Sequence, residues 1–210
     1  MAEQRRAPGR PPTHKDGEIR KLLISVAAEE FLASGYEQTR VKTLAEKAGI
    51  STRTFYKFIP NKAELFRMVA EDWLQKELQT LERRPQPEDT NKQELARLVL
   101  LYTRLLLSPT AKRTAVIIMR EMERFPEILE NYQTAVERLA HAFDTRIVHL
   151  CSKSDIDCPN PTEAAVMLRT MISGLQRQSM MRWQEDMTEQ DIIRWADHCT
   201  RFFLEGCKGL

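Results

Sequence analysis

Glycine, long apolar runs and catalytic motifs are all scarce in this sequence. Only 7 of the 210 residues are glycine and runs of β-branched residues are few, which favours helices over a sheet. No apolar run reaches the roughly 20 residues that a membrane helix needs, and no signal-peptide core follows Met1, so we expect a cytoplasmic protein without a membrane contact. No nucleophile elbow, Gly-rich phosphate loop or HExxH motif is present, which argues against an enzyme and gives no reason to expect a cofactor.

Cysteine is also sparse, and its spacing argues against a metal site. The four cysteines are Cys151, Cys158, Cys199 and Cys207. None belongs to a CxxC pair, and His141 and His149 do not stand at a metal-ligand spacing from them. We therefore expect free thiols in a reducing compartment and no bound metal. A redox pair of Cys151 with Cys158 is the alternative that the sequence leaves open.

Charge is distributed unevenly along the chain, although the net charge is only +2. Residues 1–62 hold 12 Lys and Arg against 7 Asp and Glu, a balance of +5, whereas the remainder holds 20 against 23, a balance of −3. A basic N-terminal part before a mildly acidic part is typical of a DNA-binding head on a larger body. The hydrophobic content of 42% is enough for that body to bury a core.

Two short helices joined by a tight turn are predicted in the basic part. Apolar residues at helical spacing predict a helix over Val41–Lys47, and Gly49 follows where a left-handed residue would close it. Ser51 is a good N-cap for a second helix over Thr52–Phe58. This pattern is the helix-turn-helix unit, whose second helix offers its N-terminal residues to base edges in the DNA major groove.

Another helix is predicted to begin directly after this unit. Residues 61–64 form a capping box, with Asn61 as the N-cap and Glu64 at the third helical position. Lys62 therefore stands at a helix N-terminus, where free amides, the helix dipole and an ammonium group coincide. We predict that this combination contacts a DNA phosphate.

The whole segment resembles the DNA-binding domain of the TetR family of transcriptional regulators. The matching residues are Gly35, Tyr36, Thr39, Leu44, Ala45, Ala48, Gly49, Ile50, Ser51, Thr54, Phe55, Tyr56, Phe58 and Lys62. The resemblance covers residues 18–66, and residues 120–143 resemble the body of an AcrR- or AefR-like branch of the family. The family usually has Thr at the position of Arg40 and commonly Gly at that of Arg53. Arg40 can replace a phosphate contact but not the helix cap, and Arg53 indicates direct base reading, often of guanine.

An arm precedes the head. Residues 1–15 contain three prolines and no apolar periodicity, which predicts disorder in the free protein. The Gly9-Arg10-Pro11 core resembles an AT-hook, in which Arg lies in a narrow minor groove; a solvated tail is the alternative. The predicted DNA contacts are Arg10, Thr39, Arg40, Lys42, Ser51, Thr52, Arg53, Thr54, Tyr56, Lys57 and Lys62.

Caps and prolines divide the rest of the chain into further helices. Outside the helix-turn-helix, we expect helices over about residues 18–34, 62–83, 90–107, 109–124, 126–151, 161–184 and 188–206. The prediction is an all-α chain of about nine helices without a strand. It comprises a disordered basic arm over residues 1–15, a helix-turn-helix domain over 16–62 and a helical effector-binding and dimerisation domain over 63–210.

The resemblance implies two further sites in the body. The last two helices would pair with those of a second copy in a four-helix bundle, although these residues could instead line the core of one chain. The predicted dimer contacts are Leu168, Ile172, Leu175, Ile192, Trp195, Cys199, Phe202 and Phe203. A small-molecule pocket would lie between the central helices, and a core position is the alternative for each of its candidates. Those candidates are Tyr102, Leu106, Met119, Met122, Phe125, Met167, Met171 and Gln178.

These expectations together describe a ligand-responsive regulator. Acting as a repressor, it would bind an inverted-repeat operator in double-stranded DNA as a homodimer and be released by a small-molecule effector of unknown identity. The alternatives are an activator, an architectural DNA-binding protein, or a helical ligand-binding protein without regulation.

Overall fold

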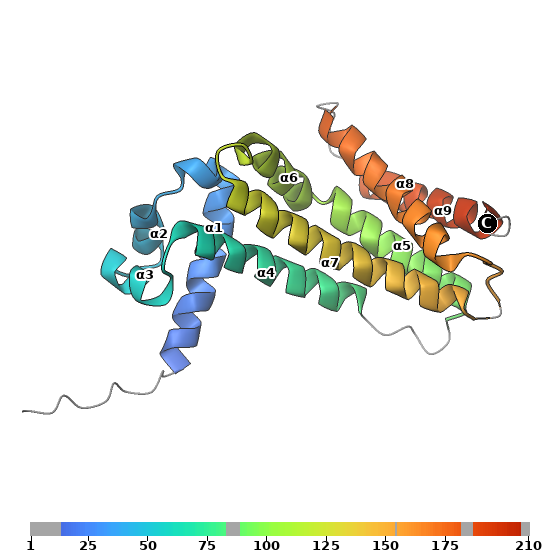
Figure 1. Cartoon of the computed structure of the whole chain (residues 1–210), viewed down its shortest axis with the longest axis horizontal. Coiled ribbons are helices and arrows are strands. Elements are labelled where there is room, and N and C mark those ends of the chain that lie inside the picture. The colour runs from blue at the N-terminus through green and yellow to red at the C-terminus, as the bar shows by residue number, and fades with distance from the viewer. Residues whose placement is uncertain (1–13, 83–88, 154, 182–186, 207–210) are drawn as a thin grey trace, which may run out of the picture. The chain divides into compact units, whose positions relative to one another are not determined.

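The computed structural model describes residues 14–82, 89–153, 155–181 and 187–206, and all regular structure within these ranges is helical. The helices are α1 (His14–Gln38), α2 (Val41–Lys47), α3 (Thr52–Phe58), α4 (Lys62–Leu81), α5 (Asn91–Leu107), α6 (Pro109–Glu121), α7 (Pro126–Cys151), α8 (Pro161–Met181) and α9 (Glu189–Gly206) (Figure 1). The predicted all-α fold is confirmed, and the predicted bounds of α2 and α3 agree with the structure. Residues 1–13 of the predicted arm, including Arg10, lie outside the described residues, whereas residues 14 and 15 belong to α1.

Most helix starts have the side-chain caps that the sequence predicts. Thr90 and Gln93 form a reciprocal capping box at the start of α5. Thr188 and Asp191 do the same at α9, and the Ser108 hydroxyl accepts a hydrogen bond from a backbone amide of α6 at 3.1 Å. Each cap pairs an amide that has no partner within its own helix, which is why these short polar signals set the helix starts.

The first helix differs from its prediction at both ends. It begins at His14 and extends to Gln38, but Gly35 breaks it with φ 81° and ψ 167°. This backbone region is accessible essentially to glycine alone, so the residue identity permits the kink. The Thr39 hydroxyl donates to the Gly35 carbonyl at 2.7 Å and closes the bend. The expected end of α1 at residue 34 therefore marks the kink, and one more turn follows it.

The chain divides into two compact units, residues 1–69 and 70–210, and the division falls within α4 rather than at its start. The first two turns of α4 belong to the N-terminal unit because Leu65 and Phe66 are buried there. Phe31 and Tyr36 of α1 meet Phe66 in a three-ring cluster with centroid separations of 5.4 to 5.6 Å. Aromatic packing of this kind fixes the start of α4 to α1.

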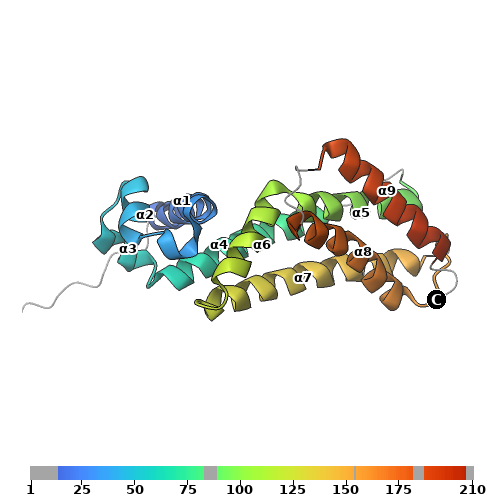
Figure 2. The same ribbon diagram turned by 90° about the horizontal axis from the view of Figure 1, so that it is seen from above.

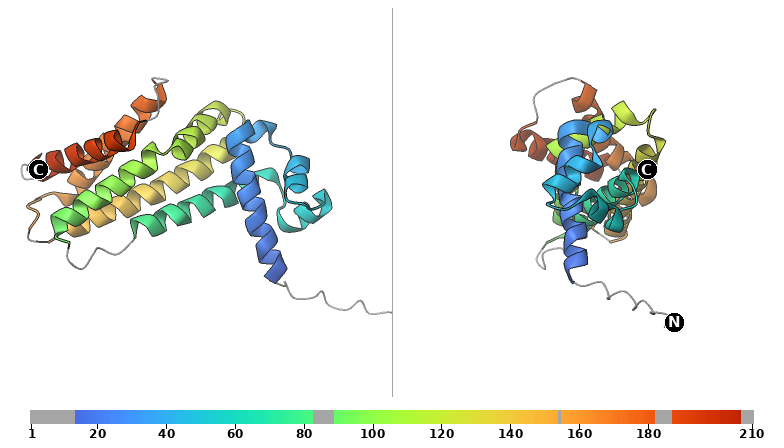
Figure 3. Two further views of the ribbon diagram at one scale, coloured as in Figure 1. Left: turned by 180° about the vertical axis from the view of Figure 1, so that it is seen from behind. Right: turned by 90° about the vertical axis from the view of Figure 1, so that its left-hand side faces the viewer.

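The C-terminal unit consists of helices that pack around one shared apolar core. In it α5 packs against α9, α7 packs against α8, and α8 and α9 also meet each other (Figure 2). The core includes Leu98, Phe143 and Leu168, and α5 and α7 run side by side through it (Figure 3). Arg169 of α8 donates to Asp144 of α7 at 2.9 Å, so a half-buried ion pair links these two helices at the edge of the core.

Candidate nucleic-acid interface and apolar groove

The turn between α2 and α3 has the geometry that its residues predict. Gly49 has φ 66°, a left-handed conformation that glycine adopts without strain. The amides of Gly49 and Ile50 then donate to carbonyls at the end of α2, at 3.0 and 2.9 Å. Ser51 accepts a hydrogen bond from the Thr54 amide at 3.0 Å and caps α3. These bonds fix the angle between the two helices, and α3 is held by its neighbours because seven residues are too few for a stable isolated helix.

One side of α3 is buried and the other faces solvent. Phe55 is fully buried and Phe58 nearly so, which anchors the helix to the unit. The exposed residues of α3 are Thr52, Arg53, Tyr56 and Lys57. Arg40, Lys42 and Ser51 are also exposed nearby in the chain, whereas Thr54 is half-buried and its hydroxyl lies 2.8 Å from that of Ser51. The exposed set is polar and basic, the composition needed to meet phosphates and base edges; its contact with DNA remains a prediction.

Thr39 does not belong to this surface. Its side chain is only 2% exposed, and its hydroxyl is used in the bond to Gly35. The expected role of Thr39 in DNA contact is therefore corrected: it closes the kink of α1. Arg40, which follows it, occupies the N-cap of α2 and makes no side-chain capping bond there, as the replacement of Thr by Arg at this position predicts.

Lys62 makes contacts within the unit that the sequence does not predict. Its ammonium nitrogen donates to the backbone carbonyls of Tyr36, Glu37 and Thr39, at 2.7, 3.2 and 3.1 Å. It also lies 4.4 Å from the centre of the Tyr36 ring, a cation–π distance. All three ammonium protons thus have an acceptor in residues 36–39, which we call the α1–α2 turn. These bonds hold Lys62 within the unit, and the phosphate contact stays a prediction. No local sequence signal identifies acceptors more than 20 residues away.

Sequence reasoning missed a second internal contact of the N-terminal unit. Glu30 is buried on α1, and its carboxylate accepts hydrogen bonds from Lys47 of α2 at 2.5 Å and from Ser34 at 3.0 Å. The Lys47 bond, followed by the Ser34 bond, lowers the pKa of the Glu30 carboxyl below its ordinary value. This ion pair ties α1 to α2.

The residues predicted for a central pocket differ widely in burial, and two of them, Met171 and Gln178, line one hollow. Tyr102 and Leu106 are buried in the core, and Tyr102 stacks on Phe143 with ring centroids 4.2 Å apart. Burial raises the pKa of the Tyr102 hydroxyl, so it stays protonated. Met119 and Met167 are instead about half exposed, at 54% and 48%. The remaining candidates, Met122, Phe125, Met171 and Gln178, are half-buried or exposed. The pocket set stays a prediction, because burial alone does not show which of these positions face a shared space.

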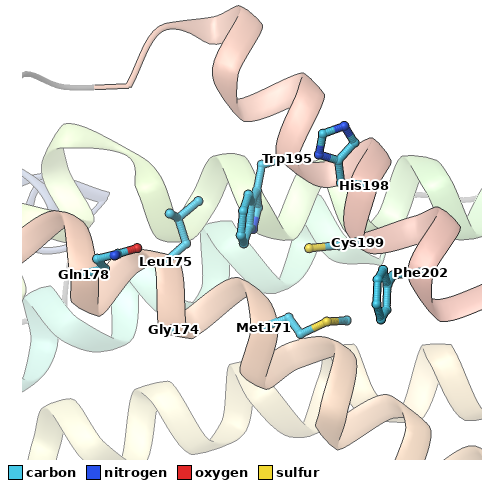
Figure 4. Close-up of a pocket in the computed structure, with 8 residues that line it drawn as sticks. All are labelled: Met171, Gly174, Leu175, Gln178, Trp195, His198, Cys199 and Phe202. Atoms are coloured by element: carbon cyan, nitrogen blue, oxygen red, sulfur yellow. The ribbon is translucent and has the colours of Figure 1, made fainter. Parts of the chain in front are cut away.

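A hollow of about 480 Å³ lies between α8 and α9 and opens to solvent. Its lining is almost entirely apolar and comprises Met171, Gly174, Leu175, Gln178, Trp195, His198, Cys199 and Phe202 (Figure 4). We call it the α8–α9 groove. Phe202 is 73% exposed, and the indole N–H of Trp195 is buried without an acceptor among the described residues. Burial raises the pKa of the Cys199 thiol to about 11. Among the described residues, the groove therefore combines an open apolar lining with a buried donor that has no acceptor, which is typical of an interaction surface.

The predicted dimer contacts divide into two groups in the structure. Leu168, Ile172, Ile192 and Phe203 are buried in their own chain, so for them the alternative of a core role holds. Leu175, Trp195 and Phe202 line the α8–α9 groove, as does the buried Cys199, together with two of the pocket candidates, Met171 and Gln178. Two neighbouring apolar stripes on each helix explain the difference: one packs inward and the adjacent one faces the groove.

Comparison with protein families gives two matches along the chain. The model of the bacterial regulatory proteins of the tetR family matches residues 23–69. The model of the C-terminal domain of the AefR-like transcriptional repressor matches residues 93–206. A comparison with curated proteins gave no match. None of the helices in the described ranges combines the length and apolarity that crossing a bilayer requires.

Solved structures of similar fold are numerous. A TetR-family transcriptional regulator from Mesorhizobium loti is 20% identical, with 92% of this chain and 98% of that chain covered and a TM-score of 0.74. The flavonoid-responsive regulator FrrA is 22% identical over 92% and 98% of the two chains, with a TM-score of 0.72. NalD, the secondary repressor of the MexAB-OprM multidrug efflux pump in Pseudomonas aeruginosa, is 23% identical over 91% and 97%, with a TM-score of 0.62. With its helix-turn-helix head and the two family matches along its length, the chain belongs to the TetR family of transcriptional regulators.

Proposed function

We propose that this regulator is a ligand-responsive repressor that binds an inverted-repeat operator as a homodimer. The observation that carries the proposal is the exposed polar and basic face of α3, held rigidly by the capped turn and the buried Phe55. A short helix anchored in this way can enter the major groove and present its N-terminal residues to base edges. Repression is favoured over activation because the body matches the AefR-like repressor model.

Within this face, Arg53 is the residue proposed to read bases. It is the second residue of α3 and is exposed, whereas Thr52, Tyr56 and Lys57 surround it on the same face. A guanidinium can donate two parallel hydrogen bonds to O6 and N7 of a guanine, which no other base pair accepts in the same way. Arg40, Lys42 and Lys57 supply positive charge for phosphates. Lys42 remains available because its ion pair with Glu46, at 3.9 Å, is almost fully exposed to solvent and weak.

A second copy of the chain is the proposed cover of the α8–α9 groove. The groove is apolar and open, and a two-fold partner would place its own Phe202 and Trp195 against the same residues here. The partner would also remove water from the 73% of Phe202 that is exposed. Dimerisation gives the protein two heads, so the operator should contain two half-sites about 34–36 Å apart or somewhat more.

Release by a small molecule completes the proposal. A ligand shifts the DNA-binding equilibrium only if it binds the released conformation better than the DNA-bound one. FrrA is described as flavonoid-responsive, which supports an effector for this chain without identifying it. The apolar character of the body favours a largely apolar ligand. An architectural DNA-binding protein is the alternative, favoured only by the AT-hook-like Gly9-Arg10-Pro11 of the arm.

Selection of duplexes from a random pool tests this function directly. The purified full-length protein is incubated with the pool at about 150 mM salt, because non-specific binding is strongly reduced at that ionic strength. Recovery of an inverted repeat would support a sequence-specific dimeric regulator. Enrichment of A·T-rich DNA without a repeat would support the architectural alternative, and no enrichment would contradict sequence-specific binding by the head.

A further inference from the structure

We propose that Lys62 is a positioning residue for DNA binding, which joins α4 to the α1–α2 turn and thereby sets the position of α2 and α3. This inference rests on the proposed function, because the position of α3 matters only if α3 reads DNA. Lys62 is the first residue of α4, and every contact that it makes in the proposal lies within the N-terminal unit.

The contacts of Lys62 are suited to holding a turn in place. The carbonyls at the end of a helix have no partner within it, and the ammonium group meets two of them, at residues 36 and 37, together with the carbonyl of Thr39 just beyond the helix. A cation at this point also interacts favourably with the negative end of the α1 dipole. Hydrogen bonds of charged groups are roughly twice as strong as neutral ones, so the turn cannot easily separate from the start of α4.

Tyr36 shows how closely the two elements are connected. Its ring lies 4.4 Å from the Lys62 ammonium and 5.4 Å from the Phe66 ring, measured to ring centroids. Lys62 and Phe66 are four residues apart, so both lie on the same side of α4. Asn61 fixes the first turn of α4 by accepting a hydrogen bond from the Glu64 amide at 2.8 Å. The α1–α2 turn is therefore held by a rigid, capped helix start.

The α1–α2 turn is separated from the rest of α1 by a kink and is connected directly to the start of α2. On one side, Gly35 interrupts α1, so the α1–α2 turn is not constrained to continue that helix. On the other side, Thr39 is followed by Arg40, the N-cap of α2, whose carbonyl accepts from the Leu44 amide at 3.1 Å. A displacement of α4 that carries Lys62 must therefore move the start of α2 or break the three ammonium bonds. The position of the helix-turn-helix thus follows that of α4.

The test replaces Lys62 with Met, which keeps the length of the side chain but removes the ammonium. Lys76→Met is the matched control on the same helix, because Lys76 is 70% exposed and its ion pair with Asp72 lies at the surface. Three quantities are measured with the full chain: the affinity for the selected operator, the salt dependence of binding to a non-operator duplex, and amide hydrogen exchange with and without the operator.

The expected result for Lys62→Met is at least about a tenfold loss of operator affinity, the loss expected for one charge-assisted hydrogen bond. The slope of log K against log salt on non-operator DNA should stay the same, because no phosphate contact is lost. Operator binding should protect α4 amides in the wild-type protein and in Lys76→Met but no longer in Lys62→Met. A slope lower by about one unit with α4 protection retained would overturn the proposal and make Lys62 a phosphate ligand.

A second pair of variants covers the case in which Lys62→Met does not fold. Thr39→Val removes the hydroxyl bond to Gly35 without changing charge, and Thr80→Val removes a comparable bond within α4, at 3.0 Å to the Lys76 carbonyl. Thr39→Val should weaken operator binding and Thr80→Val should not. Equal operator affinities of the two variants would contradict the proposal that the α1–α2 turn sets the position of α2 and α3. If the wild-type protein selects no operator, the proposed function fails. The role of Lys62 in holding the α1–α2 turn can then still be tested without DNA. The amides of residues 36–41 should exchange faster in the free Lys62→Met protein than in the wild type, and unchanged exchange rates would refute this role.

Discussion

Replacing Phe202 with Ser is expected to dissociate the homodimer proposed above. Phe202 lines the α8–α9 groove and leaves 73% of its surface to water in the single chain. A phenylalanine of about 200 Å² would then bury roughly 150 Å² against a partner. At about 25 cal/mol per Å², this area corresponds to roughly 4 kcal/mol per copy as an upper bound.

Only part of that area is converted into affinity, because association also orders side chains and restricts motion. A central anchor residue typically contributes about 2 kcal/mol when truncated. The two copies of a symmetric interface lose this contribution twice, so the dimer should weaken by about 4 kcal/mol. Its dissociation constant should therefore rise about a thousandfold.

Sedimentation velocity over a range of protein concentrations measures this change, with circular dichroism to show that the helices remain folded. Ile193→Ser is the matched control. Ile193 is 43% exposed and lies nine residues before Phe202, which is two and a half turns, so it points away from the groove. Equal dissociation constants for Phe202→Ser and the wild type, or dissociation by Ile193→Ser alone, would refute the assignment of this face as the subunit contact.

Three further predictions concern the N-terminal unit. Gly35→Ala should lower the free energy of unfolding by about 1–3 kcal/mol, since only glycine adopts this backbone conformation without strain. Gly17→Ala in the same helix, where a Cβ meets no atom within 4 Å, should raise it by about 0.5–1 kcal/mol; urea denaturation measures both, and equal effects would contradict the argument. Arg53→Ala should relax base preference at one or two operator positions by about 1–3 kcal/mol, whereas an equal loss on all duplexes would assign Arg53 to phosphates alone. The lowered pKa of Glu30 means that its charged form stabilises the fold above the ordinary carboxyl pKa and that this stability is lost as the pH falls through the lowered value. The urea unfolding midpoint of Glu30→Gln should therefore decrease less between about pH 5 and pH 3 than that of the wild type. If the two proteins show the same pH dependence, the ion pair of Glu30 with Lys47 is not the cause of the decrease.

The parts of the fold that depend on neighbouring residues could be predicted from the sequence. The bounds of α2 and α3 follow from Gly49 and Ser51, which act within one turn of the chain. The capping boxes at Thr90 and Thr188 are equally local. Such signals work because a helix end needs partners for its free amides, and the nearest short polar side chain supplies them.

Contacts between residues that are distant in the sequence could not be predicted from it. Lys62 and its carbonyl acceptors are 23 to 26 residues apart, so no neighbouring residue in the sequence indicates these bonds. In the body, helical spacing identified the apolar faces of α8 and α9 but not which stripe faces outward. Phe203 packs into the core whereas Phe202, its neighbour in sequence, remains exposed, and the packing of α9 against α5 and α8 decides between them.

The division of the chain within α4 has a consequence for exchanging modules between regulators. A head excised before residue 63 would leave Leu65 and Phe66 with the body, although both are buried residues of the N-terminal unit. The remaining fragment would expose Phe31 and Tyr36, whose rings pack on Phe66. A chimera that gives this DNA specificity to another effector domain should therefore be joined after Val69, in the middle of a continuous helix, with the helical phase of the two parents matched across the junction.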